Sequence, residues 1–466
     1  MDRSTGNTYN VSKEQIASGC ARRRFRAYPE YKNSGVEWLD QIPSHWNVKR
    51  LKYIASINDE VLAETTDPQY EMTYVDIGGV DQYQGIVNRE KYVFETAPSR
   101  ARRKVREGDV IISTVRTYLR AIAQIEAPES NLTVSTGFAV IRTGLIFSSR
   151  YAAYALRASY FIEKIVANSV GVSYPAIDAS KMSGFSASFP ELMEQEAIAA
   201  FLDRETAKID ALIEKKERLI ELLQEKRTAL ITQAVTKGLD PTVPMKDSGV
   251  EWLGEIPAHW EVKRLRHVGS AIIGLTYEPG DVVGPDEGML VLRASNVCDG
   301  HIVLDDNVFV KRLVRDCLVT REGDILICSR SGSRNLIGKS AKIDKTVMGL
   351  TFGAFMTVFR SVCNDYLFYA FNSTLFNCQS GAFLTSTINQ LTLGNLNSFT
   401  IPVPPSIEQI EITAFLDCEI AKIDALASRI REVIAHLREY RVALVSAAVT
   451  GKIDIRTEPV EARNAR

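Results

Sequence analysis

Apolar side chains recur every seven residues along residues 194–236, and charged side chains fill many of the positions between them. Ile198, Leu212 and Leu219 stand four residues before positions of the same register, and Lys216 interrupts it. A seven-residue apolar repeat is typical of a coiled-coil seam. The pattern predicts one long amphipathic helix whose seam consists of Leu202, Ile209, Leu223 and Leu230.

The same register returns in residues 408–450, where AFLDCEIAKIDAL repeats AFLDRETAKIDAL of the first segment 214 residues later. Neither segment contains Gly or Pro, so each can form one helix of about 43 residues, about 65 Å long. We expect the two helices to pack as an antiparallel coiled coil. The alternative is that each is buried separately in a large globule. The second seam is Leu416, Ile423, Ile430, Leu437 and Leu444, flanked by Ile412, Leu426 and Val433.

A second repeated stretch opens each half of the chain. Residues 34–51 read SGVEWLDQIPSHWNVKRL and residues 248–265 read SGVEWLGEIPAHWEVKRL, again 214 residues apart. Because the beginning and the end of the repeated unit share one offset, the pattern predicts a tandem duplication. The four tryptophans all lie in these motifs, and we expect them to form a plug that anchors each globular part to the helices. We interpret His45 and His259 as packing or capping residues rather than as ligands.

Between motif and helix, both halves are predicted to be mostly β-strand with interspersed helix. Gly108-Asp109 and Gly323-Asp324 each precede a short apolar run, which is typical of a strand after a turn. The sequence thus predicts an α+β protein, with two mixed α/β domains joined by two long helices in a pseudo-two-fold repeat. The expected boundaries are a leader at 1–29, globular domains at 30–190 and 239–405, helical spacers at 191–238 and 406–452, and a tail at 453–466.

The leader has no counterpart later in the chain, and its run Arg22-Arg23-Arg24-Phe25-Arg26 makes it basic. We expect it to be disordered, or to result from a start codon placed too early, because the repeated unit begins only afterwards. A DNA-touching arm is the alternative.

Charge and cysteine content limit the classes of protein. Lys+Arg 56 against Asp+Glu 57 gives a net charge of −1, so a nucleic-acid binder with this balance must concentrate its cations locally. The seven cysteines form no C-x-x-C pair, which indicates a reducing cytoplasm without a zinc site or a disulfide framework. We find no apolar run of 18 residues and no signal peptide, and expect a cytoplasmic protein away from membranes.

Catalytic motifs are missing from the sequence. Residues 332–340, GSRNLIGKS, approach a phosphate-binding loop, but five residues separate the glycines where the motif needs four. We find no G-x-G-x-x-G, no H-E-x-x-H and no cluster of nuclease carboxylates. The sequence predicts no catalytic residue, no metal site and no cofactor of its own.

Basic, hydroxyl-rich loops follow the two Gly-Asp strands at the same place in both halves. Arginine can read guanine, asparagine can read adenine, and Ser, Thr and Lys hold phosphates, so such loops suit DNA grooves. A solvated charged loop is the alternative, and recurrence in both halves favours DNA. The candidate DNA-contacting residues are Arg100, Arg102, Arg103, Lys104, Arg116, Thr117, Tyr118 and Arg120 in the first half and Arg330, Ser331, Ser333, Arg334, Asn335 and Lys339 in the second.

These features together resemble the specificity subunit of type I restriction-modification enzymes, over about residues 31–452. The most specific matches are the repeated openings, the Gly-Asp strands, the helices, and the exits Phe189-Pro190 and Pro402-Val403-Pro404-Pro405. The resemblance implies two target recognition domains, each reading one half of an asymmetric bipartite site on double-stranded DNA, and no active site. It further implies partners: two methyltransferase subunits and, in the full complex, restriction and translocase subunits. Those partners would hold S-adenosylmethionine, ATP and Mg²⁺.

Two other functions compete with this interpretation. The first is a protein-interaction scaffold built on a coiled-coil strut, which would lack the salt-sensitive binding to random DNA that a DNA reader shows. The second is a self-contained restriction enzyme, which the missing catalytic motifs disfavour.

Overall fold

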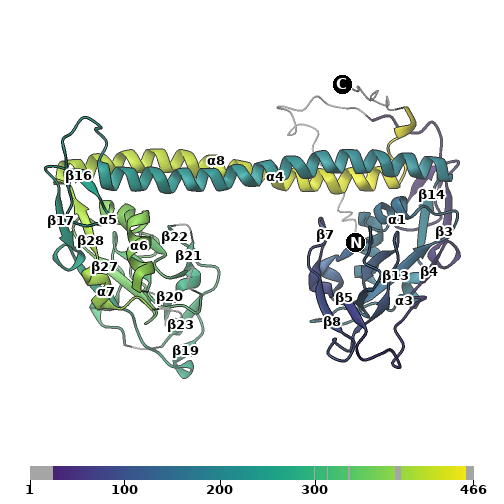
Figure 1. Ribbon diagram of the computed structural model, residues 1–466, viewed down its shortest axis with the longest axis horizontal. Coiled ribbons are helices and arrows are strands. Elements are labelled where there is room, and N and C mark those ends of the chain that lie inside the picture. The colour runs from purple at the N-terminus through teal and green to yellow at the C-terminus, as the bar shows by residue number, and fades with distance from the viewer. Residues whose placement is uncertain (1–24, 299, 312, 334–335, 384–389, 458–466) are drawn as a thin grey trace, which may run out of the picture. The chain divides into compact units, whose positions relative to one another are not determined.

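The chain folds into two compact units. The computed structural model describes residues 25–298, 300–311, 313–333, 336–383 and 390–457. Unit 1 comprises Met1–Ile213 and Ile434–Arg466, and unit 2 is Glu214–Val433. Each unit contains one globular part and a portion of both long helices, α4 (Leu192–Lys237) and α8 (Ser406–Val449) (Figure 1).

Two four-stranded sheets form the globular part of unit 1, as far as the described residues show. The first has the order β11-β10-β13-β4 and is antiparallel throughout; its strands are β4 (Ala55–Ile57), β10 (Val110–Ser113), β11 (Ile122–Gln124) and β13 (Phe138–Thr143). The second has the order β8-β5-β12-β9 with β5 and β12 parallel; its strands are β5 (Glu71–Val75), β8 (Glu90–Val93), β9 (Ala101–Lys104) and β12 (Leu132–Ser135).

Unit 2 repeats this architecture. Its first sheet, β25-β24-β27-β18, consists of β18 (Ser270–Ile273), β24 (Ile325–Cys328), β25 (Ser340–Lys342) and β27 (Met356–Arg360). Its second, β19-β23-β20-β26, consists of β19 (Val282–Val283), β20 (Met289–Leu292), β23 (Val308–Val310) and β26 (Thr351–Phe352), with β20 and β26 parallel. The strand order therefore shows the predicted duplication. The second sheets share three strands and differ in the fourth: in unit 1 it is β9, next to β12, and in unit 2 it is β19, next to β23.

Short ribbons and helices complete each unit. Unit 1 has β1 (Tyr31–Asn33) with β2 (Gln41–Pro43), β3 (Asn47–Arg50) with β14 (Ser186–Phe189), β6 (Val80–Asp81) with β7 (Gly85–Ile86), and helices α1 (Ser149–Ala155), α2 (Ser159–Ala167) and α3 (Ala179–Ser183). Unit 2 has β15 (Met245–Asp247) with β16 (Glu255–Pro257), β17 (Glu261–Arg264) with β28 (Thr400–Val403), β21 (Val297–Cys298) with β22 (His301–Ile302), and helices α5 (Asn364–Phe371), α6 (Thr374–Phe383) and α7 (Leu393–Ser398).

Helices α4 and α8 run antiparallel in each unit. In unit 1, Arg441 near the end of α8 donates to Asp210 in the first half of α4, with 2.9 Å between Nε and Oδ1. In unit 2 the order is reversed, and Nε of Arg227 in α4 lies 3.7 Å from Oδ1 of Asp424 in α8. The two pairs are equivalent in the repeat, because Asp424 and Arg441 follow Asp210 and Arg227 by 214 residues. The arginines occupy the seam itself, since their side chains are only 11% and 9% exposed.

The coiled-coil seam consists of two rows of side chains on each helix. The first row has the predicted positions, and the second row does not. Of the predicted residues, Leu202, Ile209, Leu416, Ile423, Ile430 and Leu444 are buried and Leu223, Leu230 and Leu437 are half-buried. The prediction of flanking positions is wrong for Leu212, Leu219, Leu426 and Val433, which are 37–47% exposed. The second row lies one residue later along each helix, at Ile213, Ile220, Arg227, Ile420, Ala427, Ile434 and Arg441.

The repeated tryptophan motif fastens the globular part of unit 1 to its helices. Trp46 is fully buried and donates from Nε1 to the Glu194 carboxylate at 3.1 Å. Nε2 of His45 lies 2.9 Å from the same carboxylate, so His45 contacts a side chain of the first turn of α4 and does not cap its backbone. Glu194 belongs to the first turn of α4, where a negative charge also complements the helix dipole. The end of α8 meets the same motif, because a Cβ on Gly451 would lie 2.2 Å from Pro43.

The same arrangement occurs in unit 2. Trp260 is fully buried and donates to Glu408 in the first turn of α8 at 2.8 Å, and His259 pairs with that carboxylate. The other two tryptophans behave differently. Trp38 is 45% and Trp252 43% exposed, so the prediction that all four form a buried plug is wrong for these two.

The last residues of the predicted leader belong to the folded unit. Tyr28 is 3% exposed, and its hydroxyl donates to Glu194 at 2.7 Å. Burial and the neighbouring Glu194 carboxylate raise the pKa of Tyr28 above its usual value, so the phenol stays protonated and donates. Arg26 accepts at its carbonyl from the amide of Asp454. The expectation of a disordered leader up to residue 29 is wrong for residues 25–29, and residues 1–24, including Arg22-Arg23-Arg24, lie outside the described part of the chain.

Candidate nucleic-acid interface

The loop after strand β10, residues 114–121 or loop A, carries the predicted basic side chains of unit 1. Strand β10 is buried along its whole length, so it holds the start of this loop firmly. Arg116 and Arg120 both have a left-handed backbone with φ of 51°, on either side of a single 3-10 turn, Thr117–Leu119. Non-glycine residues in this region are strained by about 1–3 kcal/mol, and such strain tends to occur at functional sites.

The Gly-Asp motif before β10 is structural. Gly108 takes a left-handed φ of 83°. The buried carboxylate of Asp109 receives two hydrogen bonds from Arg142 of β13, at 2.9 Å from Nε and 2.8 Å from Nη2. These bonds raise the pKa of Arg142. Unit 2 repeats the pair with Asp324 and Arg360, so in both units a bidentate ion pair fixes the base of the strand that precedes the basic loop.

Three of the four residues predicted on loop A are accessible. Arg116, Tyr118 and Arg120 are exposed, and the guanidinium of Arg116 lies 5.0 Å from the ring centre of Tyr174. Thr117 is different, because it is 3% exposed and its hydroxyl lies 2.9 Å from that of Ser169. The prediction that Thr117 contacts DNA is therefore wrong, since its hydroxyl is used to hold loop A against the segment around Ser169.

The predicted residues on strand β9 and just before it form a second basic group in unit 1. Arg100 and Lys104 are exposed. Arg102 is half-buried, with its guanidinium 4.4 Å from the ring centre of Phe94, and burial lowers the pKa of Arg103. Backbone hydrogen bonds connect this group to loop A through the turn at residues 136–137: Thr136 donates to the carbonyl of Arg100, and Thr114 donates to that of Gly137.

A second loop, residues 168–177 or loop B, lies against loop A, and the sequence analysis did not identify it. The amide of Ile177 donates to the carbonyl of Thr114 at 2.8 Å, and Val115 forms an isolated antiparallel bridge with Ala176. Loop B also supplies Tyr174, on which Arg116 stacks. The only sequence signal for loop B is the turn-forming run from Gly171 to Pro175, which does not indicate its neighbour in space.

The corresponding loop of unit 2, residues 329–339 or loop A2, is built in the same way. Arg330 is exposed, with its guanidinium 5.0 Å from the ring centre of Phe355. Ser333 and Lys339 are also exposed, while Ser331 is half-buried and accepts from the amide of Ser333. Arg334 and Asn335 lie outside the described residues. Burial raises the pKa of the Cys328 thiol at the end of β24 to about 11, so this cysteine is neutral at pH 7.

Unit 2 repeats the backbone hydrogen bonding that joins loop A to loop B in unit 1. In unit 2 the amide of Leu391 donates to the carbonyl of Ser329 at 2.7 Å, and Arg330 forms an isolated antiparallel β-bridge with Gln390. These contacts match those of Ile177 and Val115 in unit 1. Each unit thus presents a basic loop joined by backbone hydrogen bonds to the segment that leads into α3 or α7.

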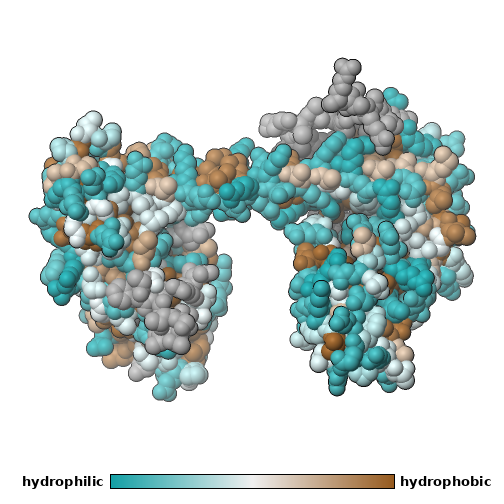
Figure 2. Space-filling model, in the orientation of Figure 1, coloured by the Kyte–Doolittle hydropathy of each residue, from teal (hydrophilic) through white to brown (hydrophobic). Residues whose placement is uncertain are grey.

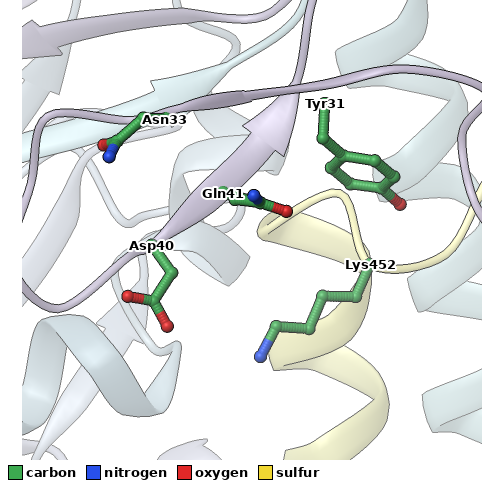
Figure 3. Close-up of a pocket in the computed structure, with 5 residues that line it drawn as sticks. All are labelled: Tyr31, Asn33, Asp40, Gln41 and Lys452. Atoms are coloured by element: carbon green, nitrogen blue, oxygen red, sulfur yellow. The ribbon is translucent and has the colours of Figure 1, made fainter.

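Other parts of the molecule offer less for chemistry. A cavity of about 610 Å³ in unit 1 is lined by Tyr31 and Asn33 of β1, Asp40 and Gln41 around the start of β2, and Lys452 after α8 (Figure 3). The Tyr31 hydroxyl is already engaged with the carbonyl of Gly451. In the described ranges, no group of three His, Cys, Asp or Glu residues is placed to hold a metal ion, and no helix is long and apolar enough to cross a membrane.

Comparisons with known proteins agree on one family. The type I restriction modification DNA specificity domain matches residues 43–222 and 311–436. The EcoKI specificity subunit of Escherichia coli K12 is 30% identical over 207 residues, which is 43% of this chain and 44% of that protein, so this chain spans less than half the length of that relative. The MjaVIII specificity subunit of Methanocaldococcus jannaschii is 23% identical over 89% of this chain and 95% of its own length. A solved structure described as concerning assembly and conformational transition of the type I R-M system has the same fold, with a TM-score of 0.68 at 23% identity, covering 88% of this chain and 99% of that one.

Proposed function

This chain belongs to the type I restriction modification DNA specificity domain family, and we propose that it is the DNA-reading subunit of a restriction-modification complex. In this proposal each unit reads one half of a bipartite site. The observation that carries it is the paired-loop arrangement, in which a basic loop after β10 or β24 is tied to a second loop in the same way in both units. Exposed arginines on a loop that follows a buried strand are suited to hydrogen-bonding base edges and phosphates.

The two half-sites should differ in sequence. Loop A presents Arg116, Tyr118 and Arg120, whereas the described residues of loop A2 present Arg330, Ser333 and Lys339. The frame beneath the loops is the same in both units, from the Asp-Arg pairs to the tryptophan anchors. A shared frame with different contact residues supports two readers that are held alike and recognise different bases.

We assign the spacing of the half-sites to α4 and α8. Each helix is continuous over 46 or 44 residues. The ion pairs Arg441–Asp210 and Arg227–Asp424 favour one register, because a slip would leave a largely buried guanidinium without its carboxylate.

The partners follow from the same proposal. Methylation and cleavage belong to two methyltransferase subunits and to restriction and translocase subunits, which would bring S-adenosylmethionine, ATP and Mg²⁺. In unit 2, Leu219 and Leu222 of α4 and Leu426 and Val433 of α8 are exposed although apolar, and Figure 2 shows brown surface on this helix pair. Exposed apolar surface on a helix pair is suited to packing against helices of another subunit.

The test uses two matched arginine variants. Arg330→Ala should weaken base discrimination in one half-site only, by about 5- to 150-fold at the contacted position, the value of about 1–3 kcal/mol for a good base contact. Arg429→Ala removes an exposed arginine of α8 in the same unit and serves as the control. The measurement is selection of bound sequences from a random duplex library, followed by titration of single-base variants.

Three outcomes would count against the proposal. Equal weakening of both half-sites would reject the assignment of loop A2 to one half-site, and so would an unchanged Arg330→Ala variant. A chain that binds random DNA at neither 50 mM nor 200 mM salt would instead support the scaffold alternative, because a DNA reader keeps a salt-sensitive non-specific mode.

A further inference from the structure

The tip of loop B is a turn closed by backbone hydrogen bonds, and it exposes apolar side chains to solvent. Val170 and Ala176 exchange two backbone hydrogen bonds of 2.8 and 2.9 Å. Gly171 has a φ of +113°, and a Cβ there would lie 3.1 Å from the carbonyl oxygen of Tyr174, so the turn requires glycine. Val170 is 77%, Val172 100% and Tyr174 66% exposed. A turn fixed in this way loses little entropy on binding, which favours recognition by its tip.

Two positively charged side chains lie on loop B or against it. The guanidinium of Arg116 lies over the Tyr174 ring, and Nζ of Lys181 donates to the carbonyl of Asn168 at 3.4 Å. The nearest acidic residue in sequence, Asp178, accepts from the amide of Ser180 as the cap of α3. The exposed Val172, with Arg116 and Lys181 on the same loop or against it, is complementary to a partner that has a small apolar group surrounded by negative charge. A DNA groove lined by phosphates has this character.

The shape of the tip favours the major groove. Side chains that wedge between base pairs in the minor groove are usually larger, such as Phe, Leu, Ile or Met. Valine is short and branched, and one face of Tyr174 is already covered by Arg116. The major groove offers one apolar group, the C5 methyl of thymine, and arginine reads guanine in the same groove. Val172 and Arg116 are therefore suited to read neighbouring base pairs from that side.

We propose that Val172 contacts the C5 methyl of a thymine in the half-site read by unit 1, next to the base pair read by Arg116. This inference rests on the proposed function and adds a specificity-determining residue to it. The chemical group recognised is a methyl on a pyrimidine. Replacement of that thymine by deoxyuridine removes the methyl and keeps every hydrogen-bonding group.

The experiment uses the tagged full-length chain purified with the subunits that accompany it. Bound sequences are selected from a random duplex library, and each thymine of the selected site is then replaced by deoxyuridine. Wild-type protein should bind one substituted duplex about fourfold more weakly, as expected for one buried methyl group. Val172→Ser should bind the thymine and deoxyuridine duplexes equally. Val87→Ser, at a 52% exposed valine of unit 1 outside both loops, should discriminate like the wild type.

The outcomes separate this inference from the proposed function. Selection of a bipartite site in which no deoxyuridine substitution costs more than twofold would overturn the role of Val172 and leave the DNA-reading function intact. Undiminished discrimination in Val172→Ser would do the same, because another residue would then read the methyl group. Failure of the complex to select any sequence would reject both.

Discussion

Replacing Glu194 by alanine should destabilise unit 1 more than the equivalent change, Glu408→Ala, destabilises unit 2. The Glu194 carboxylate accepts from Trp46, Tyr28 and His45, and its side chain is 11% exposed. Trp46 and Tyr28 are 0% and 3% exposed, so water cannot easily replace the lost acceptor for either donor. His45 has a side chain 39% exposed and can turn to solvent.

The magnitude follows from the number of stranded donors. An unsatisfied buried donor costs about 1–3 kcal/mol, so two such donors imply about 2–6 kcal/mol for Glu194→Ala. In unit 2 the carboxylate of Glu408 serves one buried donor, Trp260, and the 41% exposed side chain of His259. We expect about 1–3 kcal/mol there. For units of 150–250 residues, 1 kcal/mol corresponds to about 2–4 °C in Tm.

Calorimetry of the full chain measures the effect, because each variant should lower the transition of its own unit. Glu194→Ala should shift one transition by about 4–24 °C and leave the other in place. Glu194→Gln keeps one acceptor oxygen and should lie between the wild type and the alanine variant. Equal shifts for Glu194→Ala and Glu408→Ala, or a shift below about 2 °C for Glu194→Ala, would refute the stranded-donor argument.

Two further predictions concern spacing and pH. Seven residues are inserted after Ile213 in α4 and seven more after Val433 in α8. The accepted gap between half-sites should lengthen by about 10.5 Å, or about three base pairs at about 3.4 Å each. Selection of bound sequences measures the gap, and an unchanged gap would show that the helices do not set it. Burial raises the pKa of Tyr160 to about 12 from 10.0, so its contribution to stability is complete below pH 10 and is lost as the pH rises towards 12. The Tyr160→Phe variant should lose less stability at high pH than the wild type, by up to about 1.4 kcal/mol per pH unit. Urea unfolding at pH 8 and pH 11 measures the free energy of unfolding, and Tyr118→Phe, at an exposed tyrosine, is the control. If both variants lost the same stability between these pH values, the prediction would be contradicted.

The helix pair shows how far a periodic pattern leads. The seven-residue repeat and the absence of Gly and Pro predicted two long helices, and α4 and α8 are present. The pattern could not choose between Leu212 and Ile213 for the second row, because both are apolar and adjacent. Packing against the partner helix decides this, and it buries Ile213. It also places Arg227 and Arg441 in the seam, since a carboxylate on the opposite helix stands within reach.

The interface shows the opposite balance. The Gly-Asp strands and the basic residues after them were recognisable in the sequence, because they are contiguous and recur in both halves. Loop B was missed, since it follows loop A by about 50 residues, and only tertiary contacts, such as the bridge from Val115 to Ala176, bring the two together. The burial of Thr117 has the same origin, because its partner Ser169 belongs to the second loop.

By itself, the sequence determined the duplication, the two helices, the anchoring role of Trp46 and Trp260, and the strands that precede the basic loops. These features depend on contacts that are local or repeated, so a periodic pattern or a fixed offset records them. The tertiary structure alone decided which helix row is buried, which basic residues stay accessible, and that Tyr174 of loop B lies against Arg116. Those outcomes depend on contacts between segments far apart in the chain, and no local pattern of residues records such contacts.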